Sequence, residues 1–236
     1  LKQSKNDRFN MSNQIKKIVI VGGGTAGWLT AAVIAAKHQN QSQNGLQVTL
    51  VESSDIPTVG VGEGTWPTMK NTIQAIGIKE SDLFSRCHAV FKQGGKFVDW
   101  VHGNGDFYYH PFTVPLGYGR LDLAPYVSNI EDYAIESNFQ HHVCEAGLAP
   151  RTMAEREFNG QCNYAYHLDA GAFAEMLKEH CKANLNVQHV IATVDKVNLR
   201  EDGGIGSISM IDGEDLHGDI FVDCTGFASL LLGKAL

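Results

Sequence analysis

A glycine-rich loop between a short apolar strand and an apolar helix constrains this chain more than any other feature. Residues 22–27 read Gly-Gly-Gly-Thr-Ala-Gly and satisfy the spacing GxGxxG. A β-branched run at 17–21 precedes the loop, a helix is expected at about 26–38, and a second apolar strand at 47–52 completes a β–α–β unit. A lone GxGxxG match is weak, but this context predicts a loop that holds the diphosphate of a dinucleotide.

Each residue type in the loop fits that role. Gly22 permits the tight turn, Gly24 lets the backbone approach a diphosphate, and Gly27 lets the helix pack close to the sheet. The first helical turn, which includes Thr25 and Ala26, offers free amides and the positive end of the helix dipole to the phosphates. We therefore expect these five residues to bind the cofactor.

Glu52 ends the second strand, where a carboxylate accepts hydrogen bonds from ribose hydroxyls and repels a 2′-phosphate. The polar loop at 39–45 accounts for its longer than usual distance from the glycines. The competing interpretation is a glycine-rich turn in an unrelated α/β protein, with Glu52 merely solvated. The strand–loop–helix context favours a ribose-binding acid.

The C-terminal segment favours FAD over NAD. Strands expected at 187–194, 196–200 and 205–211 form a small β-meander that leads to an apolar strand at 219–223. In two-domain flavoproteins such a strand returns beside the first one, and the turn after it lies near the cofactor. The competing interpretation is an ordinary buried strand and turn. The residues of this segment that we expect to bind FAD are Val194, Asp223 and Gly226.

The pattern as a whole predicts an α/β protein with a Rossmann-like parallel sheet, flanking helices and a β-meander. Strands are expected within 96–127, and Asp169 is the expected N-cap of the last long helix. The expected helices between the second strand and the meander lie at 67–76, 81–90, 130–144 and 170–183.

Composition removes several classes of function. The net charge is −7 and the basic residues are scattered, which argues against a nucleic-acid surface. The histidines and the five cysteines show no metal-ligand spacing, so we expect no metal site and free thiols. Residues 1–15 are expected to be a polar extension without a signal peptide, and glycines interrupt the apolar run at 18–36. We therefore expect a cytoplasmic protein that is not inserted in a membrane.

Several motifs together resemble the flavin-dependent tryptophan halogenases, and the resemblance covers nearly all of residues 16–236. Trp28 directly follows the glycine loop, as in the family's opening signature. The other matching segments are Val-Gly-Val-Gly-Glu-Gly-Thr-Trp-Pro at 59–67, Phe-Lys-Gln-Gly-Gly-Lys-Phe-Val-Asp-Trp at 91–100, Tyr-His-Pro-Phe at 109–112, Tyr-His-Leu-Asp at 166–169 and Asp-Cys-Thr-Gly-Phe at 223–227.

The resemblance implies a chemistry and a set of site residues. Reduced FAD, supplied by a separate flavin reductase, would use O₂ and a halide ion to produce hypohalous acid. The family's essential lysine falls on Lys92, which would pass the halogen to an electron-rich aromatic molecule such as tryptophan or an indole. His110 and Phe112 would stack on that substrate. The competing interpretations are a solvated surface lysine for Lys92 and an aromatic core strand for the other two residues.

The resemblance also implies a domain organisation. Residues 16–236 would form the FAD-binding domain, with a substrate-pocket segment inserted at about 91–165. The family's W-x-W-x-I-P motif, halide-binding loop and catalytic glutamate lie further along, so the C-terminal half is expected to be absent and this chain alone to be inactive.

Two alternatives to a halogenase stay open at this point. One is an FAD-dependent aromatic monooxygenase, which shares the cofactor-binding fold. The other is a truncated flavin-binding module without catalysis. The sequence leaves a homodimer open and does not determine the arene, the ring position or the halide.

Overall fold

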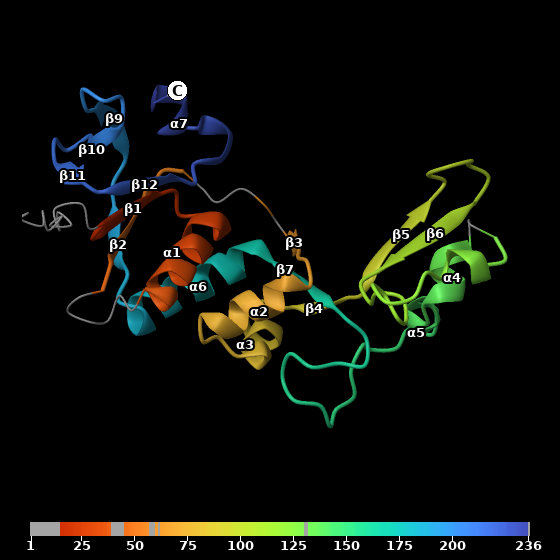
Figure 1. Cartoon of the computed structure of the whole chain (residues 1–236). Helices are drawn as coiled ribbons and strands as arrows, with labels where there is room; N and C mark the ends of the chain where they lie inside the picture. The colour runs from red at the N-terminus through yellow and green to blue at the C-terminus, as the bar shows by residue number, and fades with distance from the viewer. Residues whose placement is uncertain (1–14, 39–44, 57–59, 61, 130–131, 236) are drawn as a thin grey trace, which may run out of the picture. The chain divides into compact units, whose positions relative to one another are not determined.

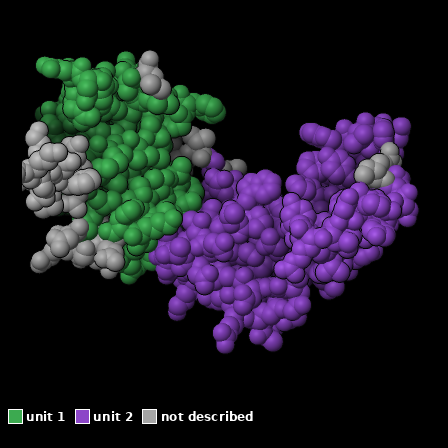
Figure 2. All heavy atoms as spheres, in the orientation of Figure 1, with its two compact units in different colours: residues 1–59, 177–236 green, residues 60–176 purple. Residues whose placement is uncertain are grey.

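The computed structural model describes residues 15–38, 45–56, 60, 62–129 and 132–235. The expected N-terminal extension therefore lies outside the described residues, apart from Ile15. The chain divides into two compact units, unit 1 with residues 1–59 and 177–236 and unit 2 with residues 60–176 (Figure 2). The substrate-pocket segment expected at about 91–165 falls inside unit 2, whose bounds are wider.

Unit 1 is built on a four-stranded parallel sheet with the order β12-β1-β2-β8 (Figure 1). These strands are β1 (Lys17–Val21), β2 (Gln47–Glu52), β8 (Gln188–Ile191) and β12 (Ile220–Asp223). Apolar runs without alternation suit strands that are covered on both faces. The predicted Rossmann-like sheet is confirmed, and β12 pairs with β1 in parallel as expected.

Helix α1 (Thr25–Lys37) covers one face of this sheet. It buries Trp28 and three alanines, Ala31, Ala32 and Ala35, whose small side chains let the helix lie close to the strands. Helix α6 (Ala170–Asn184) reaches α1 through Cys181, whose thiol lies 3.6 Å from the backbone oxygen of Trp28.

The meander covers the opposite face. It consists of β9 (Val194–Leu199), β10 (Ile205–Met210) and β11 (Asp215–His217), paired antiparallel in the order β11-β10-β9. Ile208 and Met210 of β10 pack in one buried cluster with Val19, Val21 and Val51 of the sheet. The predicted meander is confirmed with one correction. The strand expected at 187–194 is shorter, since β8 ends at Ile191. It pairs with β2, so it is the fourth strand of the parallel sheet and does not belong to the meander.

Unit 2 contains a three-stranded antiparallel sheet and a separate hairpin. The sheet has the order β3-β7-β4, and the hairpin pairs β5 with β6. The strands are β3 (Gly62–Gly64), β4 (Val90–Lys92), β5 (Gly94–Val98), β6 (Phe107–Pro111) and β7 (Ala165–Asp169). The helices are α2 (Thr68–Ala75), α3 (Glu80–Arg86), α4 (Tyr133–Ser137) and α5 (Gln140–Glu145), with a short 3₁₀ turn, η2 (Ala124–Tyr126).

Two helix predictions in unit 2 are wrong in their extent. The helix expected at 81–90 ends at Arg86, because the amides of Cys87 and Ala89 both bond to the carbonyl of Leu83 and His88 takes a left-handed φ of 52°. The helix expected at 130–144 is divided into α4 and α5 by Asn138, whose backbone is extended (φ −147°, ψ 136°); residues 130 and 131 lie outside the described residues.

The predicted cap of α6 is confirmed. The carboxylate of Asp169 accepts a hydrogen bond from the amide of Ala172 at 2.8 Å, which satisfies one of the free donors at the start of the helix. Within the described part of the chain, no helix combines the length and the apolar character that crossing a membrane requires.

A buried carboxylate joins the helices and the sheet of unit 2. Glu80 is 1% exposed and accepts hydrogen bonds from the hydroxyls of Tyr164 at 2.6 Å and Tyr166 at 2.7 Å. Its second oxygen accepts bonds from the guanidinium of Arg151 and from the amide of Phe158. Burial, reinforced by the hydrogen bond to Glu80, raises the pKa of each tyrosine far above the ordinary value for tyrosine. Both hydroxyls therefore keep their protons and donate hydrogen bonds.

Replacing Glu80 with alanine should lower the free energy of unfolding by about 3–5 kcal/mol, since it leaves Arg151 and two tyrosine hydroxyls buried without their acceptor. Urea denaturation followed by circular dichroism measures this loss. The matched control is Glu145→Ala, which removes the exposed Lys96–Glu145 pair and should cost less than about 1 kcal/mol. Equal effects of the two substitutions would contradict the structural role of Glu80.

Candidate functional site

The glycine loop is shaped by backbone atoms that leave no room for side chains. Gly22 has φ +118°, and a Cβ there would lie 2.2 Å from the carbonyl oxygen of Cys224. A Cβ on Gly27 would lie 1.8 Å from the carbonyl oxygen of Gly22. The loop, the turn after β12 and the start of α1 therefore approach one another as closely as backbones can.

The start of α1 is suited to an anion. Its N-cap is Gly24, no side chain caps the helix, and no acidic residue stands in the first turn. The amides of the first turn, which includes Thr25 and Ala26, therefore have no side-chain acceptor among the described residues. Amides of this kind, together with the helix dipole, can bind a phosphate group.

Glu52 lies against this loop. A Cβ added to Gly23 would lie 1.5 Å from the Oε2 atom of Glu52, so the carboxylate occupies the space that a side chain at 23 would take. Glu52 is at the C-terminal end of β2, where ligands bind in open α/β sheets. A carboxylate thus stands beside the uncapped amides at the start of α1, and the chemistry of these residues fits the adenosine diphosphate part of FAD.

Asp223 organises the turn after β12. Its Oδ1 accepts hydrogen bonds from the amide and the hydroxyl of Thr225 at 3.0 and 2.6 Å. Its Oδ2 accepts bonds from the amides of Leu231 and Leu232 at 2.8 and 2.9 Å, just before and at the start of α7 (Leu232–Ala235). Burial alone would raise the pKa of Asp223, but these donors outweigh it and lower the pKa below its ordinary value.

The low pKa of Asp223 predicts a pH-dependent stability. A carboxyl whose pKa is lower in the folded state stabilises the protein above its unfolded pKa of about 3.9 and loses that contribution as the pH falls through the folded pKa. The stability difference between the wild type and Asp223→Asn should be largest near neutral pH and should shrink below about pH 4. Urea unfolding across this range tests it, and a difference that is constant with pH would contradict it.

The other two predicted residues of the C-terminal segment lie in different surroundings. Val194 begins β9, and its side chain packs against the buried cluster between the meander and the sheet. Gly226 begins a 3₁₀ turn, η4 (Gly226–Ala228), with φ +60°, and a Cβ there would meet nothing within 4 Å. Cys224 joins this turn to the loop, because its amide bonds to the carbonyl of Val21 at 2.8 Å. Gly226 thus lies in the turn that borders the glycine loop, whereas Val194 packs in the hydrophobic core.

In unit 2, Lys92 lies in an aromatic environment. It ends β4, opposite Ala165 of β7, and is half-buried. Its ammonium is 5.4 Å from the ring centre of Trp66 and 5.6 Å from that of Phe112. These two rings are 5.5 Å apart. A lysine and two aromatic faces therefore converge from three segments of the chain.

The third strand of the sheet reaches the same place. A Cβ on Gly64 of β3 would lie 3.3 Å from the Nζ atom of Lys92 and 3.3 Å from the Nδ1 atom of His167. Since Gly64 and Lys92 lie on strands that flank β7 on opposite sides, the side chain of Lys92 extends across the middle strand toward β3. The glycine in β3 leaves the space that the lysine head occupies.

Hydrogen bonds fix the backbone of Phe112 beside Lys92. The amide of Phe112 donates to the carbonyl of Gln93 at 3.0 Å, and its carbonyl accepts a bond from the side chain of Asn163 at 3.1 Å. Gln140, which is fully buried, donates to the carbonyl of Asn163 at 2.7 Å. Phe112 is thus held by hydrogen bonds to its backbone and not by packing alone.

His110 is placed differently from Phe112. Its side chain is exposed on β6, and alternation along the strand turns it away from the face that carries Tyr109 and Pro111. Phe112 follows the end of the strand and joins Lys92. The structure therefore brings Lys92 and Phe112 together, whereas the substrate contact of His110 stays a prediction.

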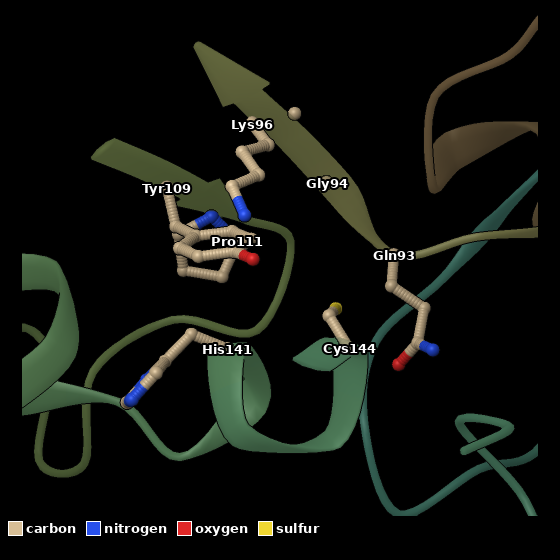
Figure 3. Close-up of a pocket in the computed structure, with 8 residues that line it drawn as sticks. Gln93, Gly94, Lys96, Tyr109, Pro111, His141 and Cys144 are labelled. Carbon is tan, nitrogen blue, oxygen red and sulfur yellow. The ribbon is translucent and has the colours of Figure 1, made fainter. Parts of the chain in front are cut away.

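A cavity of about 260 Å³ lies between the hairpin and α5 (Figure 3). Lys96 from β5 and Cys144 from α5 border it, with Tyr109, Pro111 and His141. None of the predicted site residues lines this cavity. Within the described residues, no three histidine, cysteine or acidic side chains are grouped closely enough to hold a metal ion.

Sequence reasoning singled out some of these residues only as letters of a motif. Trp66 and His167 stood in matching segments without a role, and Glu80, Gln140 and Asn163 carried no signal at all. A buried polar residue far from its partners in sequence has no local pattern that reveals it.

A parallel sheet, a glycine loop and an acid at the end of the second strand are the features of a Rossmann-like fold of the kind that binds dinucleotides. Comparison with known proteins narrows this class. The family model described as tryptophan halogenase matches residues 17–236. This chain belongs to the tryptophan halogenase family.

Individual relatives agree with the family model. The 7-chloro-L-tryptophan 6-halogenase KtzR from Kutzneria sp. (strain 744) is 35% identical, over 93% of this chain and 46% of its own length. The tryptophan 7-halogenase RebH from Lentzea aerocolonigenes is 32% identical, over 96% of this chain and 45% of its own length. The chain thus spans a little under half the length of these relatives.

A solved structure confirms the fold. The crystal structure of a tryptophan halogenase from Shewanella frigidimarina NCIMB 400 superimposes with a TM-score of 0.85 at 40% sequence identity. The match covers 94% of this chain and 44% of the other.

Proposed function

We propose that this chain binds reduced FAD and supplies the lysine for halogenation of an electron-rich aromatic molecule, tryptophan or an indole. The observation that carries the proposal is the position of Lys92, whose ammonium faces the rings of Trp66 and Phe112 at 5.4 and 5.6 Å. The relatives named above act on tryptophan or chlorotryptophan, which supports an arene of that kind.

The FAD-binding residues would be those of the glycine loop and its neighbours. The amides at Thr25, Ala26 and Gly27 bind the diphosphate, and Glu52 accepts hydrogen bonds from the adenosine ribose. Gly226 and the turn that Asp223 stabilises border the same loop. Reduced FAD, when bound, supplies hypohalous acid from O₂ and a halide ion.

Lys92 would deliver the halogen. Its amine donates a hydrogen bond to hypohalous acid, or exchanges a proton for the halogen and releases water. The rings of Trp66 and Phe112 offer flat faces to an aromatic substrate. Phe112 and, in our proposal, His110 stack on that substrate. The side-chain amide of Asn163 holds the carbonyl of Phe112, and the buried Gln140 holds the backbone of Asn163.

Two partners follow from this chemistry. The halide is a substrate and must be present in solution. The reduced form of FAD must be supplied, and the resemblance to flavin-dependent halogenases implies a separate flavin reductase for this step.

The test is a product assay on the protein as its host makes it. The protein is incubated with a flavin reductase, NADH, FAD and tryptophan, with bromide or chloride in parallel, and the products are analysed by mass spectrometry. A halide-dependent mass increase, with the isotope pattern of bromine or chlorine, is expected. Incorporation of oxygen instead would favour a monooxygenase, and flavin binding without any product would favour a non-catalytic flavin-binding module; either result would refute the proposal.

A further inference from the structure

We propose that His189 positions Glu52 for the ribose and thereby determines the preference of the site for nucleotides with both ribose hydroxyls. This inference rests on the proposed binding of FAD and deepens it. The two residues are 137 positions apart in sequence, and their contact arises only in the folded sheet.

The contact is short and largely shielded from solvent. The Nε2 atom of His189 lies 2.8 Å from the Oε1 atom of Glu52. The side chain of His189 is 9% exposed and that of Glu52 is 23% exposed. In the tautomer with its proton on Nε2, the imidazole donates this hydrogen bond to the carboxylate, which accepts it.

The sheet and α1 together hold the imidazole in place. His189 stands opposite Leu50 in the pairing of β2 with β8, so it lies on the same face of the sheet as Leu50 and Glu52. Its ring meets the indole of Trp28 edge to face, with ring centres 5.0 Å apart and an interplanar angle of 71°. Trp28 is 1% exposed and belongs to the helix whose first turn faces the phosphates.

The two carboxylate oxygens of Glu52 have different neighbours. Oε1 is bound by His189, whereas Oε2 lies against Gly23 of the loop. A carboxylate that is held at one oxygen has a defined plane, and accepting bonds from two neighbouring hydroxyls requires such a plane. A free glutamate would have to lose its side-chain rotations each time a nucleotide binds.

The test compares two substitutions at 189. His189→Phe keeps a ring against Trp28 and removes the donor, whereas His189→Gln keeps an amide donor near the position of Nε2. The probes are FAD, ADP and 2′-deoxy-ADP, with dissociation constants from calorimetry or fluorescence. The readout is the ratio of the affinities for ADP and 2′-deoxy-ADP, which a general loss of structure would not change.

We expect His189→Phe to weaken the binding of FAD and ADP by about tenfold and to leave the affinity for 2′-deoxy-ADP nearly unchanged. The ratio of the affinities for ADP and 2′-deoxy-ADP should therefore fall by about tenfold. His189→Gln should restore most of the ratio. In the Glu52→Gln background His189→Phe should have no further effect on the ratio, because the residue that it positions is gone. If His189→Phe does not fold, His189→Asn, whose amide is too short to reach Glu52, replaces it.

A wild-type ratio in His189→Phe, or an equal loss for ADP and 2′-deoxy-ADP, would overturn the positioning role. A wild-type protein that does not bind FAD would instead refute the proposed function itself. The two failures are therefore distinguishable in one set of titrations.

Discussion

Lys92→Met should abolish halogenation while FAD binds with unchanged affinity. Methionine fills the space of the lysine stem beside Trp66 and Phe112 but has no amine to bind or carry the halogen. Groups that take part directly in proton or group transfer are worth about 10²–10⁴-fold in rate, so product formation should fall by at least about 100-fold. Mass spectrometry of the products and a flavin titration measure the two quantities separately.

Two further variants sharpen this test. Lys92→Arg keeps the positive charge but cannot provide a neutral amine, so it should be as inactive as Lys92→Met. Lys96→Met is the matched control, because Lys96 lies four residues on, pairs with Glu145 at 2.8 Å and should be dispensable. Wild-type turnover in Lys92→Met would remove Lys92 from the mechanism.

Gly27→Ala should abolish flavin binding with only one added carbon atom. That atom would lie 1.8 Å from the carbonyl oxygen of Gly22, and a backbone atom in a tight turn cannot move aside as a flexible side chain can. The loop must separate from α1, which displaces the amides that hold the diphosphate. We expect the dissociation constant for FAD to rise by at least about 100-fold, which corresponds to about 3 kcal/mol.

The matched control for this substitution is Gly171→Ala, which also lies near the start of a helix. Its Cβ would meet no atom closer than the side-chain oxygen of Asp169 at 3.4 Å, an ordinary contact. Gly171→Ala should bind FAD as the wild type does, and circular dichroism should show that both variants are folded. A folded Gly27→Ala protein with wild-type affinity would contradict the assignment of the loop.

The parallel sheet of unit 1 could be predicted from the sequence because its signals are local. Three features each predict an element from neighbouring residues alone: the β-branched run, the glycine spacing and the apolar strand near the end of the chain. The assignment of 187–191 to the meander failed because a short apolar strand shows the same pattern in either sheet. Its partner, β2, is more than 130 residues earlier in the chain.

Unit 2 was predicted less well, and the reasons are particular. The helix expected at 81–90 included Val90, but pairing with β7 makes Val90 the first residue of a strand. Asn138 was placed inside a helix, yet its side chain accepts a hydrogen bond from the amide of Gln140 at 2.8 Å and begins a new one. Both errors are cases in which distant or local hydrogen bonds outweigh helical propensity.

The candidate site divides in the same way. Motifs pointed to the glycine loop, Glu52, Lys92 and Phe112, and the structure places each where a site can form. Local patterns could not reveal His189, since its partner is on another strand. Val194 packs in the core and His110 is exposed, so the ligand contacts of these two residues stay predictions.

We propose that amides at the start of α1 bind the diphosphate of FAD while Glu52 binds its ribose. A crystal structure of the protein soaked with FAD would show both contacts. We expect diphosphate oxygens within hydrogen-bonding distance of the amides at 25–27 and both ribose hydroxyls on the carboxylate of Glu52. Flavin bound elsewhere, or a loop that excludes it at saturating FAD, would refute this mode of binding.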